Sequence, residues 1–247
     1  MMSVNTSTKL DNYDRYQGEF NTLHEVLKSK LNNKDRNFGR LIQYGKANND
    51  KVVNNYYDEL NFHREFRNIL SHSHTRGKPP VAQPSDTIIE EIRALSNRIK
   101  SPKKASDLFL KDVTHFNYDD SLAKVLQFVN NTQYSQFPVF EDTQLKGLIT
   151  ENGITQFLSR SVKDDLISIK ETNISDVINL DEAKDSWEIV NSNTLLIDVK
   201  EIFNKKLNAG NSLFAILISN TGKNIENPED IIGIITPWDL PKVLKNI

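Results

Sequence analysis

Apolar residues in the first hundred positions recur with helical spacing. Between residues 13 and 31 they return every three or four positions, at Tyr16, Phe20, Leu23, Leu27 and Leu31. This spacing gathers them on one face of a helix. The same pattern predicts a helix from 38 to about 45, a third from about 50 to 72 and a fourth from about 86 to 100. We therefore expect residues 13–100 to form an all-α bundle without strands.

After Lys104 the pattern changes, because short β-branched runs alternate with helical stretches and the order of segments repeats. The corresponding pairs are 106–109 with 175–178, 121–130 with 196–207, 137–140 with 214–218, and 147–150 with 233–236. The second copy contains a longer hairpin, at 220–230. One copy alone would bury a marginal core, so we expect the two copies to pack together.

Composition narrows the class of protein. The chain has 247 residues, a net charge of −2 and no cysteine, which excludes disulfides, thiolate metal sites and cysteine nucleophiles. No apolar run approaches the length of a membrane span, and the first 17 residues lack the apolar core of a signal peptide. These features predict a soluble cytoplasmic protein without a membrane partner, and the five histidines do not suggest a metal site.

The stretch Gly233–Leu240 carries the clearest candidate chemistry in the second half. The run Ile231–Ile235 predicts a buried strand, and Pro237 suits the first turn of a helix. Thr236 would cap this helix, and Asp239 would lie in its first turn. A hydroxyl and a carboxylate at a helix start can hold vicinal hydroxyls, such as those of a ribose, beside a phosphate. The alternative is a capped helix with a surface aspartate.

The repeated order of elements resembles a tandem pair of CBS domains, also called a Bateman module. The resemblance spans about residues 105–247 and rests on Tyr134–Val139, Leu145–Thr150 and Gly233–Leu240. It implies two β-α-β-β-α repeats within 104–247, at about 105–165 and 171–247. Together with the all-α bundle at 1–103, this predicts an α+β fold. The resemblance also implies a regulatory role, with an adenine nucleotide (AMP, ADP, ATP or cyclic di-AMP) as ligand and no other cofactor.

The resemblance assigns one complete nucleotide cleft. In this cleft Thr236 and Asp239 would bind the ribose and the phosphate, and Trp238 would face the same cleft. The opposite wall comes from the other repeat, at Tyr134, Ser135, Gln136 and Phe137, where an aromatic ring and backbone amides would hold an adenine.

The symmetry-related cleft is incomplete in the sequence. Thr150 is followed three residues later by Gly153 where an aspartate is expected, and Asn152 is a weak substitute. We therefore predict one competent site and one degenerate site. The alternative is that both clefts have lost their ligand and serve only to dimerise.

The third predicted helix ends in a motif that resembles the HEPN superfamily. The motif is Arg67, Asn68 and His72, in which Asn68 and His72 are four residues apart and share a helix face. The resemblance implies a homodimer and a metal-independent ribonuclease, in which the arginine holds a phosphate and the histidine moves a proton. His74, Arg76 and Lys78 would add positive charge for an RNA backbone.

Two interpretations of the whole chain remain open. In the first, the CBS pair senses a nucleotide and controls the helical effector, a ribonuclease. In the second, the chain is a non-catalytic nucleotide-binding adaptor whose helical domain dimerises or docks a partner protein. The sequence does not distinguish which nucleotide binds, whether it activates or inhibits, or which RNA or protein is the partner.

Overall fold

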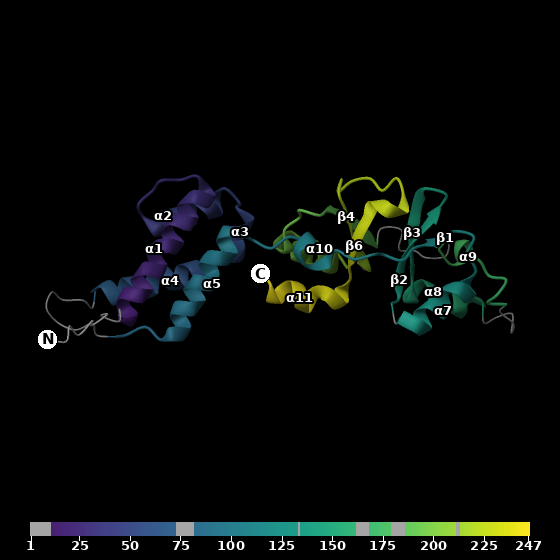
Figure 1. The fold of residues 1–247 in the computed structure, drawn as a ribbon, viewed down its shortest axis with the longest axis horizontal. Helices are drawn as coiled ribbons and strands as arrows, with labels where there is room; N and C mark the ends of the chain where they lie inside the picture. The colour runs from purple at the N-terminus through teal and green to yellow at the C-terminus, as the bar shows by residue number, and fades with distance from the viewer. Residues whose placement is uncertain (1–10, 73–81, 133, 162–167, 179–185, 211–212) are drawn as a thin grey trace, which may run out of the picture. The chain divides into compact units, whose positions relative to one another are not determined.

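The computed structural model divides the chain into two compact units, Met1–Pro102 and Lys103–Ile247. It describes residues 11–72, 82–132, 134–161, 168–178, 186–210 and 213–247. Figure 1 traces both units with their elements labelled. Each unit has its own buried core, so each is described by itself.

The described part of the first unit contains helices only, in agreement with the predicted bundle. They are α1 (Asn12–Leu31), α2 (Phe38–Ala47), α3 (Lys51–Asn55), α4 (Tyr57–His72) and α5 (Asp86–Lys100). Asp11, Asn37, Asp50 and Ser85 cap α1, α2, α3 and α5 by accepting backbone N–H groups. The prediction of one helix over 50–72 was wrong, because the helix is interrupted at Tyr56. The residues before this break, Asn54 and Asn55, have low helix propensity.

Helices α1 and α5 form the main pair of the bundle and lie side by side in Figure 1. Their apolar faces supply much of the core, including Leu23, Leu27, Ile92 and Leu95. At the surface Arg93 on α5 donates to Glu19 on α1 at 2.7 Å. Helix α4 packs against α2 and α1. The bundle is therefore held by apolar burial, and the surface ion pairs contribute little.

The second unit contains two three-stranded sheets with the same topology. The first repeat has β1 (Phe116–Asn117), β2 (Gln136–Glu141) and β3 (Gln144–Thr150), and the second has β4 (Trp187–Asn191), β5 (Ala215–Ser219) and β6 (Ile231–Ile235). In each sheet the first strand is parallel to the second and the second is antiparallel to the third. The helices of the first repeat are α7 (Leu122–Thr132) and α8 (Glu151–Ser161), and those of the second are α10 (Leu196–Asn208) and α11 (Leu240–Lys245).

The two sheets share an apolar core. It is formed by Phe140 and Leu148 of the first sheet with Ala215, Leu217, Ile231 and Ile234 of the second. Each repeat therefore buries apolar surface that it could not bury alone. The structure confirms the predicted α+β class, with a helical first unit followed by two repeated units of strands and helices.

Two short helices each pack in the core of the repeat other than the one that they precede in the chain. Helix α6 (Ser106–Phe109) precedes the first sheet in the chain, yet Phe109 packs in the core of the second repeat. Helix α9 (Ile174–Ile178) precedes the second sheet, yet Ile174 and Val177 pack in the core of the first repeat. Gly233 permits the packing of α6, because a Cβ atom there would lie 2.3 Å from the carbonyl oxygen of Phe109.

Candidate functional site

The segment after β6 begins as a 3₁₀ turn, η3 (Pro237–Asp239), and only then continues as α11. The predicted single helix was therefore wrong in detail. Pro241 has no N–H to donate to the Pro237 carbonyl, and the N–H of Leu240 takes that place. The turn projects Thr236 and Asp239 together from the end of a buried strand.

Thr236 and Asp239 are joined by two hydrogen bonds. The backbone N–H and the hydroxyl of Thr236 both donate to Oδ2 of Asp239, at 2.8 and 3.0 Å. The other carboxylate oxygen, Oδ1, makes no hydrogen bond within the described part of the chain. One oxygen of Asp239 thus fixes the turn, and the other remains available as an acceptor.

The other predicted nucleotide residues differ in exposure. Trp238 is 80% exposed and Tyr134 is 56% exposed, whereas Phe137 is only 2% exposed. The Phe137 ring packs edge-on against Phe116 and Phe128, with centroids 5.2 and 5.5 Å away. Its side chain therefore belongs to the core, and only its backbone could meet a ligand.

Ser135 and Gln136 are half-buried at the start of β2. The Ser135 carbonyl accepts the N–H of Glu151 at 3.1 Å, and Gln136 pairs with Thr150 across the sheet. Among the described residues, no hydrogen bond joins Tyr134–Phe137 directly to Thr236 or Asp239.

Lys111 contacts both β6 and Tyr134 and was not singled out in the sequence. Its backbone N–H donates to the carbonyl of Ile232 in β6 at 3.1 Å. Its ammonium lies 5.2 Å from the centre of the Tyr134 ring. A cation thus connects the β6 strand of one repeat with the aromatic residue of the other. No local motif marks this lysine, because it acquires its position only when 109–111 pairs with β6.

Two pockets lie near these residues. One of about 430 Å³ is apolar and is lined by Leu213, Phe214, Pro237 and Leu240, among others. Another of about 740 Å³ lies beside Lys111, with Asp112, His115 and Glu229 in its lining. Neither is lined by Tyr134, Thr236 or Asp239. Neither of these two pockets therefore joins Tyr134–Phe137 to Thr236–Asp239.

The related segment of the first repeat has a different local chemistry. The Thr150 hydroxyl is buried and accepts the backbone N–H of Gly153 at 3.0 Å. It acts as an ordinary helix cap for α8, with no carboxylate three residues on. The expectation of a degenerate second site rests on this missing acidic group.

The comparison with protein families assigns the first repeat. Residues 105–160 match the model of the CBS domain. These residues are a CBS domain. The match begins at Ala105, before α6, and ends within α8, so it covers every element of the first repeat from α6 to β3. The second repeat has the same order of strands as this CBS domain. None of the curated proteins matches the chain.

Several solved structures are similar to part of the chain at low identity. A putative acetoin utilization protein from Vibrio cholerae is 14% identical and has a TM-score of 0.44; the match covers 59% of this chain and 93% of that one. CBSX2 in complex with AMP is 12% identical, with a TM-score of 0.41 and coverages of 57% and 96%. The CBS domain pair of MJ0100, in complex with 5′-methylthioadenosine and S-adenosyl-L-methionine, is 11% identical, with a TM-score of 0.40 and coverages of 59% and 98%. At these values the likeness carries no inference about ligand or activity.

In the helical unit, Arg67 and Asn68 lie in different environments. Arg67 is half-buried, with its guanidinium carbon 5.8 Å from the centre of the Phe20 ring. Its Nε atom is buried and finds no hydrogen-bond partner within the described residues. Asn68 is exposed and lines a polar pocket. His72 is the last residue of α4, and its side chain lies outside the described residues, as do His74, Arg76 and Lys78.

A buried polar pair joins α1 and α4 near Arg67. The Tyr16 hydroxyl lies 3.2 Å from Nδ1 of His63 and donates to the His63 carbonyl at the same distance. Burial lowers the pKa of His63 to about 4. Burial also raises the pKa of Tyr16, although the nearby Arg67 partly offsets this. This histidine is therefore a neutral core residue at pH 7.

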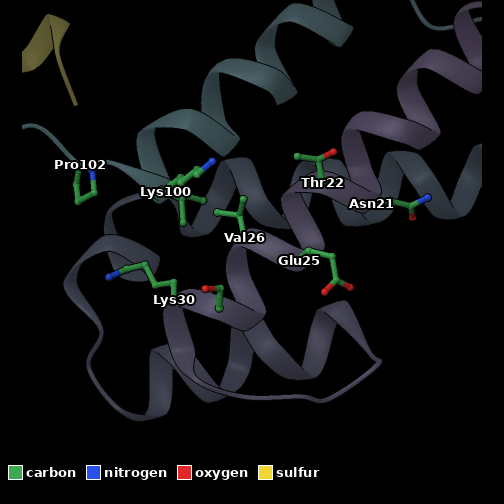
Figure 2. A pocket seen from close by; sticks show the side chains of 9 residues that line it. Asn21, Thr22, Glu25, Val26, Lys30, Lys100 and Pro102 are labelled. Carbon is green, nitrogen blue, oxygen red and sulfur yellow. The ribbon is translucent and has the colours of Figure 1, made fainter.

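A further pocket of about 710 Å³ lies between α1 and the end of α5 (Figure 2). Figure 2 shows Thr22, Val26 and Lys30 on one side and Lys100 with Pro102 on the other. No residue singled out in the sequence lines it. Within the described residues there is no group of three metal-ligating side chains, and no helix has the length and apolarity to cross a membrane.

Proposed function

We propose that the second unit senses an adenine nucleotide at the end of β6, between Thr236–Asp239 and Tyr134–Phe137. The observation that carries this proposal is the Asp239 carboxylate, which is fixed through Oδ2 to Thr236 and keeps Oδ1 available. A carboxylate held in this way accepts the hydroxyls of a ribose without losing further side-chain entropy. The ligand class, AMP, ADP, ATP or cyclic di-AMP, is the one that the CBS resemblance implies.

Lys111 supports this proposal with a positive charge. Its ammonium lies 5.2 Å from the centre of the exposed Tyr134 ring, and its backbone N–H is bonded to Ile232, four residues before Thr236 in the chain. A phosphate would replace the weak cation–π contact with a charge-assisted hydrogen bond. The freed Tyr134 ring would then stack on the adenine.

Calorimetric titration with AMP, ATP and cyclic di-AMP tests the site. We expect Asp239→Ala to lower the affinity for whichever of these ligands binds most tightly, by at least about tenfold, because the ribose loses its charged acceptor. Asp230→Ala is the matched control. The Asp230 carboxylate accepts the N–H groups of Glu226 and Asn227 and so caps η2 (Pro228–Asp230) of the same repeat, away from the end of β6. Equal binding by wild type and Asp239→Ala would overturn the site.

We also propose that this cytoplasmic sensor controls the helical unit, and two effectors are possible for it. The packing of Arg67 against Phe20 favours a unit that dimerises or docks a partner over a ribonuclease, because this guanidinium is turned toward the bundle. Phe62 supports this choice, since it is 48% exposed on α4 and stacks on Phe66 at 5.9 Å. An exposed ring supported by a half-buried one in this way is suited to a homodimer contact.

The ribonuclease alternative has a direct test. Purified protein is incubated with labelled RNA in EDTA beside the His72→Ala variant. On the adaptor interpretation we expect the same background cleavage from both proteins. A loss of cleavage of about a hundredfold or more in His72→Ala would instead establish a histidine-dependent ribonuclease.

A further inference from the structure

A polar groove of about 520 Å³ lies between α2 and α4 of the helical unit. Its walls are Asn37, Arg40 and Gln43 from α2 and Arg64, Glu65 and Asn68 from α4. Apart from Glu65, every one of these side chains can donate a hydrogen bond. Among them, only Asn68 belongs to the motif of Arg67, Asn68 and His72.

Positive charge in the groove is not balanced by the protein. Arg40 is exposed, and its guanidinium has no hydrogen-bond or ion-pair partner within the described part of the chain. Nη2 of Arg64 lies 3.1 Å from Oε1 of Glu65, and Glu65 carries the only carboxylate in the lining. Two guanidinium groups thus share one counter-charge, and a bound anion would supply the second.

The position of Arg64 increases this imbalance. Its Cδ atom would lie 3.3 Å from a Cβ atom at Gly39, so the side chain rests against the first turn of α2. That turn contains no acidic residue. A cation beside a positive helix end is electrostatically unfavourable in the empty groove, and an anion there would reverse the sign of the interaction.

The rest of the groove is polar and partly fixed. Gln43 donates to the Tyr57 hydroxyl at 3.3 Å, and Lys46 lies 4.0 Å from the centre of the Tyr57 ring. The side-chain carbonyl oxygen of Gln43 accepts no hydrogen bond among the described residues. Asn68 is exposed, and both its amide oxygen and its amide nitrogen are available for hydrogen bonds. Amides next to arginines suit a ligand in which a phosphate is attached to a polar organic group.

We propose that the α2–α4 groove binds a phosphorylated ligand. Arg40 and Arg64 hold its phosphate, and Gln43 and Asn68 contact its organic part. The phosphate comes from a free nucleotide or from a single nucleic-acid strand, and both present the same group to the arginines. This site lies in the helical unit and does not involve Asp239, so it can be tested separately from the nucleotide sensor. It shares Asn68 with the predicted ribonuclease motif.

The test uses the full-length protein and two probes without adenine, so that neither reports on the CBS site. Calorimetry measures UMP, and fluorescence anisotropy measures labelled octauridylate. Arg40→Gln removes the unpaired guanidinium. Arg93→Gln is the matched control, because it removes the same charge from α5, where the guanidinium is paired with Glu19. Thermal unfolding of both variants checks that the bundle remains folded.

We expect at least one probe to bind, with affinity about tenfold lower in Arg40→Gln and unchanged in Arg93→Gln. If octauridylate binds through both arginines, raising the salt from about 0.05 to 0.2 M should weaken it roughly sevenfold. UMP binding alone assigns the site to a free nucleotide, and octauridylate binding alone assigns it to a strand. The proposal is overturned if neither probe binds, if both variants bind alike, or if decaglutamate binds as tightly with the same dependence on Arg40.

Discussion

At the scale of single residues, the same side-chain types serve structure in one place and candidate chemistry in another. His63 is a potential base by type, but it is 3% exposed and its ring nitrogen contacts the Tyr16 hydroxyl. Asp239 is a helix-capping residue by position, yet one of its oxygens remains unused. Burial and hydrogen-bond partners therefore separate core residues from candidate ligand contacts more reliably than residue type.

The burial of His63 predicts a pH-dependent stability. Its folded pKa of about 4 lies below the ordinary value of 6.5, so between these values the unfolded chain binds the extra proton. The free energy of unfolding should therefore fall as the pH falls from about 6.5 to 4, by at most about 3 kcal/mol from this group. Urea unfolding of the full chain at several pH values measures it.

Two histidine variants isolate this effect. In His63→Gln the decline between pH 6.5 and 4 should be clearly shallower, with a remainder from His24, whose pKa is also lowered, chiefly by burial. In His115→Gln it should be unchanged, because His115 is exposed. An equally steep decline in His63→Gln and wild type would contradict the assignment.

At the scale of elements, the short helix that precedes each sheet of the second unit packs in the core of the other repeat. Phe109 of α6 packs in the second repeat, and Lys242 on α11 donates to the neighbouring Leu108 carbonyl at 2.9 Å. Phe116, only seven residues later, packs in the first repeat with Phe137. This exchange of helices ties each repeat to the other, so neither core is complete within one continuous segment.

This exchange can be tested by removing one ring at a time. Phe109→Ala and Phe116→Ala should each cost about 3 to 5 kcal/mol of stability, since both rings are buried. Amide hydrogen exchange should rise mainly in β5 and β6 for Phe109→Ala and mainly in β2 and β3 for Phe116→Ala. Faster exchange in β2 and β3 for Phe109→Ala would mean that α6 belongs to its own repeat.

At the scale of the whole molecule, the chain consists of two compact units with separate cores. The second unit contains the complete pair of sheets and both groups of predicted nucleotide residues. A sensor and an effector in separate units can be coupled only if the ligand binds two states of the protein with different affinity.

The division predicts that residues 103–247 fold alone. We expect this fragment to show one cooperative thermal transition and the same nucleotide dissociation constant as the full chain, because its core and its candidate site lie within the unit. Circular dichroism and calorimetry measure the two properties. An unfolded fragment, or one with altered affinity, would show that the helical unit contributes to the core or to the site.

The sequence by itself determined the class of most elements, because hydrophobic periodicity reports which face of a segment is buried. It predicted α1, α2 and α5, the change of pattern after Lys104 and the repeated order of segments. It also placed Thr236 and Asp239 in one turn, since residues three apart at the start of a helix are neighbours. These are local properties, and they need no knowledge of the packing partner.

The tertiary structure decided everything that depends on distant segments. The exchange of α6 and α9 and the contacts of Lys111 with β6 and Tyr134 depend on how the two repeats pack together. The burial of Phe137 depends on its packing against Phe116 and Phe128 within the first repeat. The groove between α2 and α4 likewise exists only because these two helices pack together and bring Arg40 and Arg64 into one lining. Spacing along a chain carries no information about such pairs, since side chains far apart in sequence become neighbours only when the core is packed.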